Sequence, residues 1–130
     1  MLKITKKTEY ALIAIRHIED TDALVSSKDI SKQYDIPKEL MAKTLQLMAK
    51  AGYLKAIKGP NGGYESQISL EDISLREFME SIEGPLGLID CHANNHCSQI
   101  STCNIKDPIK RINNSLLNFL DNISLVEITR

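Results

Sequence analysis

Aromatic residues are scarce in this sequence, and long apolar runs are missing. It contains no tryptophan, two phenylalanines and four tyrosines. A membrane-spanning helix needs about 20 consecutive apolar residues, whereas the best apolar run near the start, ALIAI, ends at Arg16 without the small-residue cleavage site of a signal peptide. We therefore expect a cytoplasmic protein that has no membrane partner.

Signatures of catalysis and of nucleotide binding are absent as well. The sequence shows no nucleophile arranged with a base, no glycine-rich phosphate loop and no dinucleotide fingerprint. We therefore expect that the protein is not an enzyme.

Cysteine is rare too, and all three cysteines lie in one polar stretch, DCHANNHCSQISTCN, at equal steps of six residues. Thiols in the cytosol are kept reduced, and an odd number of cysteines cannot pair completely into disulfides. A structural disulfide framework is therefore excluded. Metal binding or redox chemistry at Cys91, Cys97 and Cys103 is the better interpretation.

Charge is unevenly distributed between the two halves of the chain. Residues 1–65 carry 11 lysines and arginines against 8 acidic residues, whereas residues 66–130 carry 5 against 9. A basic half next to an acidic half is a mild indication that the first half binds a polyanion.

Apolar residues with helical spacing predict a first helix over residues 8–19. A second, short helix should run to about Gln33, because Ser26 stands three residues before Asp29 in a capping-box arrangement and Ile30 offers a buried anchor. The inward face of the first helix is expected to comprise Tyr10, Ala11, Ala14, Ile15 and Ile18.

Pro37 suits the first position of a third helix, which should run to Ala51 and stop at Gly52 in a left-handed conformation. Two short strands, YLKAIK and GYESQIS, surround the turn-forming string GPNGG and predict a β-hairpin. Helix, short helix, turn, helix and hairpin make a winged helix-turn-helix, which we assign to residues 1–68. The residues expected to face inward from the third helix are Leu40, Thr44, Leu47, Met48 and Ala51.

Residues 69–130 return to helical spacing on both sides of the cysteine loop. SLREFMESIEG predicts one amphipathic helix that ends at Gly84 and Pro85. DPIKRINNSLLNFLDNI predicts a long amphipathic helix whose apolar stripe needs a partner, so we expect a dimerisation helix that pairs with a second copy; the alternative is that it folds back on its own domain. The fold class is thus mainly α with a small β-hairpin wing. The inward residues are Leu75, Phe78, Met79 and Ile82 in the first helix and Ile109, Ile112, Leu116, Phe119, Leu120 and Ile123 in the second.

The helix-turn-helix pattern places the third helix in the major groove of double-stranded DNA. Lysine can reach guanine or phosphate, glutamine can pair with adenine, and glutamate can accept from cytosine. The wing adds lysines around a glycine-rich tip that can approach a phosphate or enter a minor groove. The expected DNA contacts are Lys38, Glu39, Ala42, Lys43 and Gln46 from the helix and Lys55, Lys58, Gly59, Pro60, Asn61, Gly62 and Gly63 from the wing.

Three motifs together resemble a known family. LKITKKTEYALIAI at the start, GYLKAIKGPNGGY at the wing and three cysteines separated by five residues each are similar to the Rrf two (Rrf-type) family of bacterial winged-helix transcription regulators, in its cluster-binding branch of IscR-, NsrR- and RsrR-like proteins. This resemblance implies a homodimer that binds partly palindromic promoter DNA. It also implies a 2Fe-2S cluster, held by the three cysteines, through which iron, redox state or nitric oxide is sensed.

A fourth ligand position remains after the three cysteines. IscR-like members have a histidine three residues after the last cysteine, whereas this chain has Lys106, and a protonated ammonium has no lone pair. In the nitric-oxide and redox sensors an acidic residue on the first helix of the other subunit fills the position, and Glu9 stands at the matching place. The resemblance therefore implies Glu9 as the fourth ligand, donated across the dimer. His92 and His96 are the alternatives, because imidazole also ligates iron-sulfur clusters.

Other uses of the cysteines stay open. CHANNHC offers a Cys3His set for zinc, although zinc ligand pairs are usually two to four residues apart. Two of the thiols could instead form a regulatory disulfide without any cofactor. An iron-sulfur electron carrier is the least favoured function, because it would leave the wing and the recognition helix without a purpose.

Overall fold

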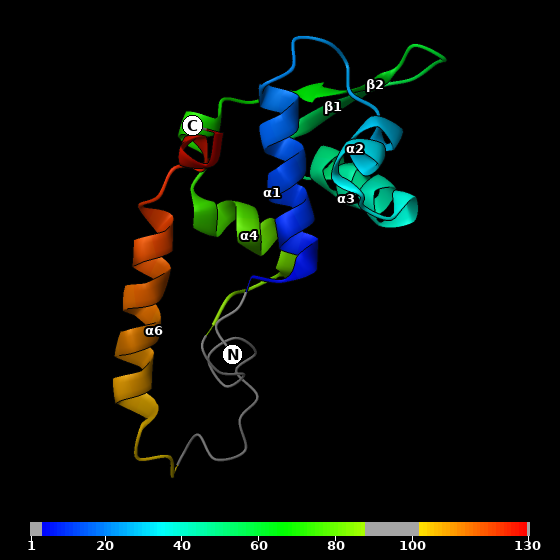
Figure 1. Ribbon diagram of the computed structural model, residues 1–130. Helices are drawn as coiled ribbons and strands as arrows, with labels where there is room; N and C mark the ends of the chain where they lie inside the picture. Colours follow the sequence, from blue (N-terminus) through cyan, green and yellow to red (C-terminus); the bar gives the residue numbers. More distant parts are fainter. Residues whose placement is uncertain (1–3, 88–101, 130) are drawn as a thin grey trace.

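Three helices and a hairpin follow one another in the first half of the chain, which confirms the winged helix-turn-helix order (Figure 1). The structure, a computed structural model, describes residues 4–87 and 102–129. The elements of the first half are α1 (Lys6–Glu19), α2 (Ser27–Tyr34), α3 (Lys38–Lys50), β1 (Leu54–Ile57) and β2 (Gly63–Ser66).

Helices on both sides of the cysteine segment make up the second half. These are the 3-10 turn η1 (Leu70–Asp72), α4 (Leu75–Glu83), α6 (Lys106–Asp121) and the 3-10 turn η2 (Leu125–Thr129). Cys91 and Cys97 lie outside the described residues. In the described part of the chain, no helix is long and apolar enough to cross a membrane.

Local hydrogen bonds set the start of α2 as the sequence predicts. The Asp29 amide donates to the Ser26 hydroxyl at 3.1 Å, and the Ser26 amide donates to the Asp29 carboxylate at 3.2 Å. The bond from the Ser26 amide, and after it a hydrogen bond with the Ser26 side chain, hold the pKa of Asp29 below its ordinary value, because they favour the charged carboxylate. Pro37 precedes the first residue of α3 rather than occupying it.

The hairpin is tied to the rest of the winged helix through Val25. β1 and β2 pair antiparallel, with Leu54 opposite Ser66. Val25 and Tyr64 exchange two backbone hydrogen bonds of 3.1 and 2.7 Å, which adds the segment before α2 to the edge of β2. The wing is therefore anchored at Tyr64, where β2 leaves the tip, and the tip projects on the same side as α2 and α3 (Figure 1).

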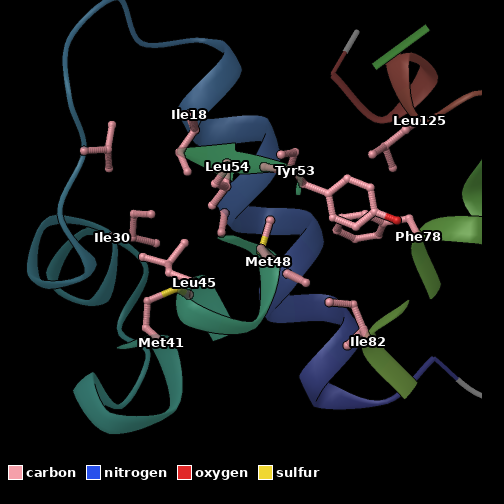
Figure 2. Close-up of a cluster of buried hydrophobic side chains, with 14 of the residues drawn as sticks. Ile18, Ile30, Met41, Leu45, Met48, Tyr53, Leu54, Phe78, Ile82 and Leu125 are labelled. Atoms are coloured by element: carbon pink, nitrogen blue, oxygen red, sulfur yellow. The ribbon is translucent and has the colours of Figure 1, made fainter. Parts of the chain in front are cut away.

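One hydrophobic core joins the two halves of the chain. Helix α1 contacts α3 and β2 as well as α4 and η2. Figure 2 shows the ring of Tyr53, from the start of the wing, next to that of Phe78 in α4, and their centroids are 5.2 Å apart. Burial raises the pKa of Tyr53, because the phenolate would lose its hydration. The division at residue 68 stays a prediction, but the buried residues on its two sides belong to one cluster.

The inward face of α3 differs from the predicted one. Leu40 is 48% exposed and Ala51 is exposed, whereas Met41 and Leu45 are fully buried. Two neighbouring apolar stripes share Met48, and helical spacing alone permits either of them. Packing against α1 and α2 selects the stripe that points Met41 and Leu45 toward Ile30 (Figure 2).

Helix α6 packs against α4 with a side other than its predicted apolar stripe. Asn113 and Leu117 are buried, whereas Ile112 is 55% and Phe119 63% exposed. The junction is reinforced at the C-terminal end of α6, where the hydroxyl of Ser74, the N-cap of α4, donates to the Asp121 carboxylate at 3.0 Å. Of the predicted stripe, only Ile112 and Phe119 are exposed within one copy of the chain. The other four residues are half-buried: Ile109, Leu116, Leu120 and Ile123.

Because Met41 is buried and Leu40 is half exposed, truncating these two neighbouring side chains should have very different effects on stability. Met41→Ala should lower the free energy of unfolding by about 2–5 kcal/mol, because it opens a cavity in the core. Leu40→Ala should change it by less than about 0.5 kcal/mol, because the side chain is half exposed. Urea unfolding at one fixed protein concentration measures both, and equal losses would contradict the assignment.

Candidate DNA interface and cysteine site

The predicted DNA-contacting residues of α3 lie on its outward face. Lys38, Glu39, Lys43 and Gln46 are exposed, and Ala42 is half-buried. Within the described residues, none of the four polar side chains has a hydrogen bond or ion pair. They are therefore free to contact base edges or phosphates.

The wing presents its two lysines and the outer part of its tip to solvent. Lys55, Lys58 and residues 59–61 are exposed. Gly62 and Gly63 are half-buried and are needed by the hairpin itself. A Cβ at Gly62 would lie 2.0 Å from the Ile57 carbonyl oxygen, and a Cβ at Gly63 would lie 2.8 Å from that of Val25. The structure therefore explains these two glycines without a phosphate.

The candidate cluster ligands are only partly within the described residues. Cys91, Cys97, His92 and His96 lie outside them. Cys103 is a free, half-buried thiol just before α6. Among residues 4–87 and 102–129, no three potential metal ligands come together.

Glu9 lies in the first turn of α1, where its carboxylate forms an ion pair with Lys6 at 3.3 Å. The side chains of Lys6 and Glu9 are 77% and 44% exposed, so this pair contributes little to stability. The Glu9 carboxylate is accordingly accessible to a group outside its own protomer.

A polar contact that the sequence did not predict joins the end of α4 to the start of α1. The Thr8 hydroxyl, fully buried, donates to the Glu83 carboxylate at 3.1 Å, and the Thr5 hydroxyl donates to the same oxygen. Thr5 is also the N-cap of α1, and its hydroxyl accepts from the Thr8 amide at 3.3 Å. A threonine before a helical pattern signals the cap, but no local pattern signals a partner 75 residues away.

Comparison with known proteins identifies the family. The family model of the Rrf2 iron-dependent transcriptional regulators matches residues 4–130. The chain belongs to the Rrf2 family. It is 29% identical to the HTH-type transcriptional regulator NsrR of Bacillus licheniformis over 98% of this chain and 92% of the relative.

Solved Rrf2 structures share the fold. CymR (YrzC), the global cysteine regulator of B. subtilis, superposes with a TM-score of 0.75 at 21% identity, over 99% of this chain and 97% of that one. IscR of T. potens superposes with a TM-score of 0.73 at 22% identity, over 98% and 85% of the two chains. The winged-helix fold class is thereby confirmed.

Membership of the Rrf2 family also confirms the coarse function. The chain is a transcriptional regulator of the winged-helix type, which implies DNA binding, and it is not an enzyme. The outward face of α3 and the wing lysines are exposed, and their contacts with DNA stay a prediction.

The Glu83 contact predicts a stability loss that an ordinary surface acid would not cause. Glu83→Ala should lower the free energy of unfolding by about 1–2 kcal/mol, because the buried Thr8 hydroxyl loses its charged acceptor. Glu127→Ala is the matched control, an exposed acid whose side chain makes no hydrogen bond or ion pair within the described residues, and should leave stability unchanged. Chemical unfolding at fixed concentration separates the two, and equal stability of both variants would contradict this role.

Proposed function

We propose that this regulator is a cytoplasmic homodimer that senses iron, redox state or nitric oxide through a 2Fe-2S cluster and binds partly palindromic promoter DNA accordingly. The observation that carries the proposal is the run of three evenly spaced cysteines, Cys91, Cys97 and Cys103, in a family described as iron-dependent. The similarity to an NsrR over nearly the whole chain supports the same interpretation.

The donor chemistry fits a cluster. Thiolates are the usual ligands of iron-sulfur clusters, and Cys103 is a free thiol at the edge of the described structure. Glu9 supplies the fourth ligand from the other subunit, and its exposed ion pair with Lys6 can be given up at low cost. His92 and His96 are the alternative fourth ligands. When bound, the cluster supplies a group whose ligation and redox state respond to iron, oxidants and nitric oxide.

Glu83 connects the cysteine segment to the DNA-binding elements. The segment that carries the three cysteines begins directly after α4, whose last residue holds the start of α1 through Thr5 and Thr8. Helix α1 in turn packs against α3. Ligation at the cysteines therefore biases which arrangement of α1 and α3 is populated, and DNA affinity follows this population. A difference of about 1.4 kcal/mol between the arrangements changes affinity tenfold.

A partly uncovered apolar stripe along α6 supports the dimer. Its spacing alternates between four and three residues, as in the seam of paired helices. Leaving several large apolar side chains in water is unfavourable, and a second copy offers a self-complementary partner. This α6 stripe adds Ile105, the N-cap, to the predicted residues and omits Leu120. Three of its residues are exposed (Ile105, Ile112 and Phe119), and three are half-buried (Ile109, Leu116 and Ile123).

A cofactor-free thiol sensor is the second candidate. The fold match to CymR, a global cysteine regulator, favours it, because a regulator of this fold need not have the same input as IscR. In this case two of Cys91, Cys97 and Cys103 form a regulatory disulfide on oxidation. A zinc site of the three thiolates with a histidine of the same segment is the separate metal alternative.

Anaerobic purification should give a reddish-brown protein, and Cys97→Ala should lose this colour while staying folded. Among Glu9→Ala, His92→Ala and His96→Ala, only the first should perturb the visible absorption and circular dichroism. DNA affinity of the wild type should differ at least tenfold between the coloured and the bleached protein. A colourless wild type that holds zinc, or that takes up no iron on reconstitution, would refute the cluster.

Introducing a charge into the α6 stripe should separate the dimer. Ile112→Glu should sediment as a folded monomer, because the side chain is exposed within one copy but would be buried between two. Asn114→Glu is the control, an exposed residue outside the stripe on the same helix, and should stay dimeric. An Ile112→Glu protein that remains a dimer would place the interface elsewhere.

A further inference from the structure

A small cleft opens where the first turns of α1 meet the first half of α3. Its volume is about 240 Å³. From the sequence, Tyr10, Leu40 and Thr44 are expected to face inward and Lys43 to contact DNA. Lys6 and Lys7 have no predicted role. The lining residues are Lys6, Lys7 and Tyr10 from α1 and Leu40, Lys43 and Thr44 from α3.

The cleft combines an apolar floor with a cationic rim. Tyr10 is half-buried and Leu40 is half exposed, so both present carbon surface. The Thr44 hydroxyl is already used, since it donates to the Leu40 carbonyl at 2.7 Å. Three exposed lysines surround the cleft, Lys6, Lys7 and Lys43, and no acidic residue is among its lining residues. Such a surface suits a ligand that is anionic and carries an apolar portion.

We propose that this cleft receives the sugar-phosphate backbone of one DNA strand next to the groove that α3 enters. The inference rests on the proposed DNA binding and adds α1 to the interface. Phosphate oxygens pair with ammonium groups, and the deoxyribose carbons pack on Leu40 and Tyr10. Lys43 belongs both to the cleft and to the outward face of α3, so the two contact surfaces are continuous.

Lys7 is the cleanest probe of this contact. The Lys6 ammonium forms an ion pair with the Glu9 carboxylate at 3.3 Å, so replacing Lys6 would also alter the surroundings of a candidate cluster ligand. Lys43 lies on α3 and would contact DNA whether or not the cleft holds the backbone, so its replacement would not test the cleft. Lys7 is exposed and has no ion pair or hydrogen bond within the described residues, so Lys7→Gln removes a charge without disturbing the fold.

The experiment measures dissociation constants over a series of salt concentrations. The full-length protein is titrated into a duplex that the wild type selects from a random pool, and into a shuffled duplex of the same composition. Lys7→Gln should weaken binding to both duplexes by the same factor and make the slope of log K against log salt less steep by about one. Lys110→Gln, an exposed lysine on α6, is the control and should leave both quantities unchanged.

Leu40→Ala completes the test, because it removes apolar contact without changing charge. This variant should weaken binding to both duplexes by the same factor and leave the slope of log K against log salt unchanged. If Lys7→Gln keeps the wild-type slope while Lys43→Gln weakens binding, the cleft does not hold the backbone and the DNA-binding function stands. If Leu40→Ala changes the preference between the two duplexes, Leu40 reads a base and the backbone assignment is wrong. A wild type that binds neither duplex in any cluster state would overturn both proposals.

Discussion

Helix α1 is the constraint on which both halves of the molecule depend. It packs against α3 and the wing strand β2, and also against α4 and η2, through a face of small and branched residues. Ala11 and Ala14 have no exposed surface, which lets neighbouring elements approach closely. The elements proposed to contact DNA and those that flank the cysteine segment therefore share one packed core, centred on α1.

The first turns of α1 bring together residues that serve different purposes. Thr5 and Thr8 bind Glu83 at the end of α4, Glu9 is the proposed cluster ligand, and Lys6 lies between Glu9 and the cleft toward α3. If Glu9 held a cluster, its ion pair with Lys6 would be given up and the Lys6 ammonium would be left for a phosphate. Competition for one lysine could therefore couple the two sites over a single helical turn, in addition to any movement of α1.

Local chemistry made much of the fold predictable. The Ser26 capping box, the end of α4 at Gly84 and the hairpin around GPNGG each depend on residues within a few positions of one another. The phase of α3 was not predictable, because two stripes that share Met48 fit the helical period and only the packing of α1 and α2 chooses between them. The Thr8 and Glu83 contact was not predictable either, since it joins positions with no local relation. The ligand set of the cysteine site is inferred from the spacing of the cysteines in the sequence, because Cys103 alone of the three thiols is within the described residues.

Helix α6 explains why a signal at the cysteines would be felt by a dimer rather than by one protomer. Glu83 ends α4 before the cysteine segment, and Cys103 stands just before α6 after it, so α4 and α6 of one copy flank the segment. One side of α6 packs against α4 through Leu117, while Ile112 and Phe119 remain exposed for the proposed second copy. A fourth ligand donated by the partner's α1 would then tie the segment of one protomer to the DNA-binding elements of the other. The separation of the two recognition helices, to which a palindromic site is sensitive, would depend on that tie.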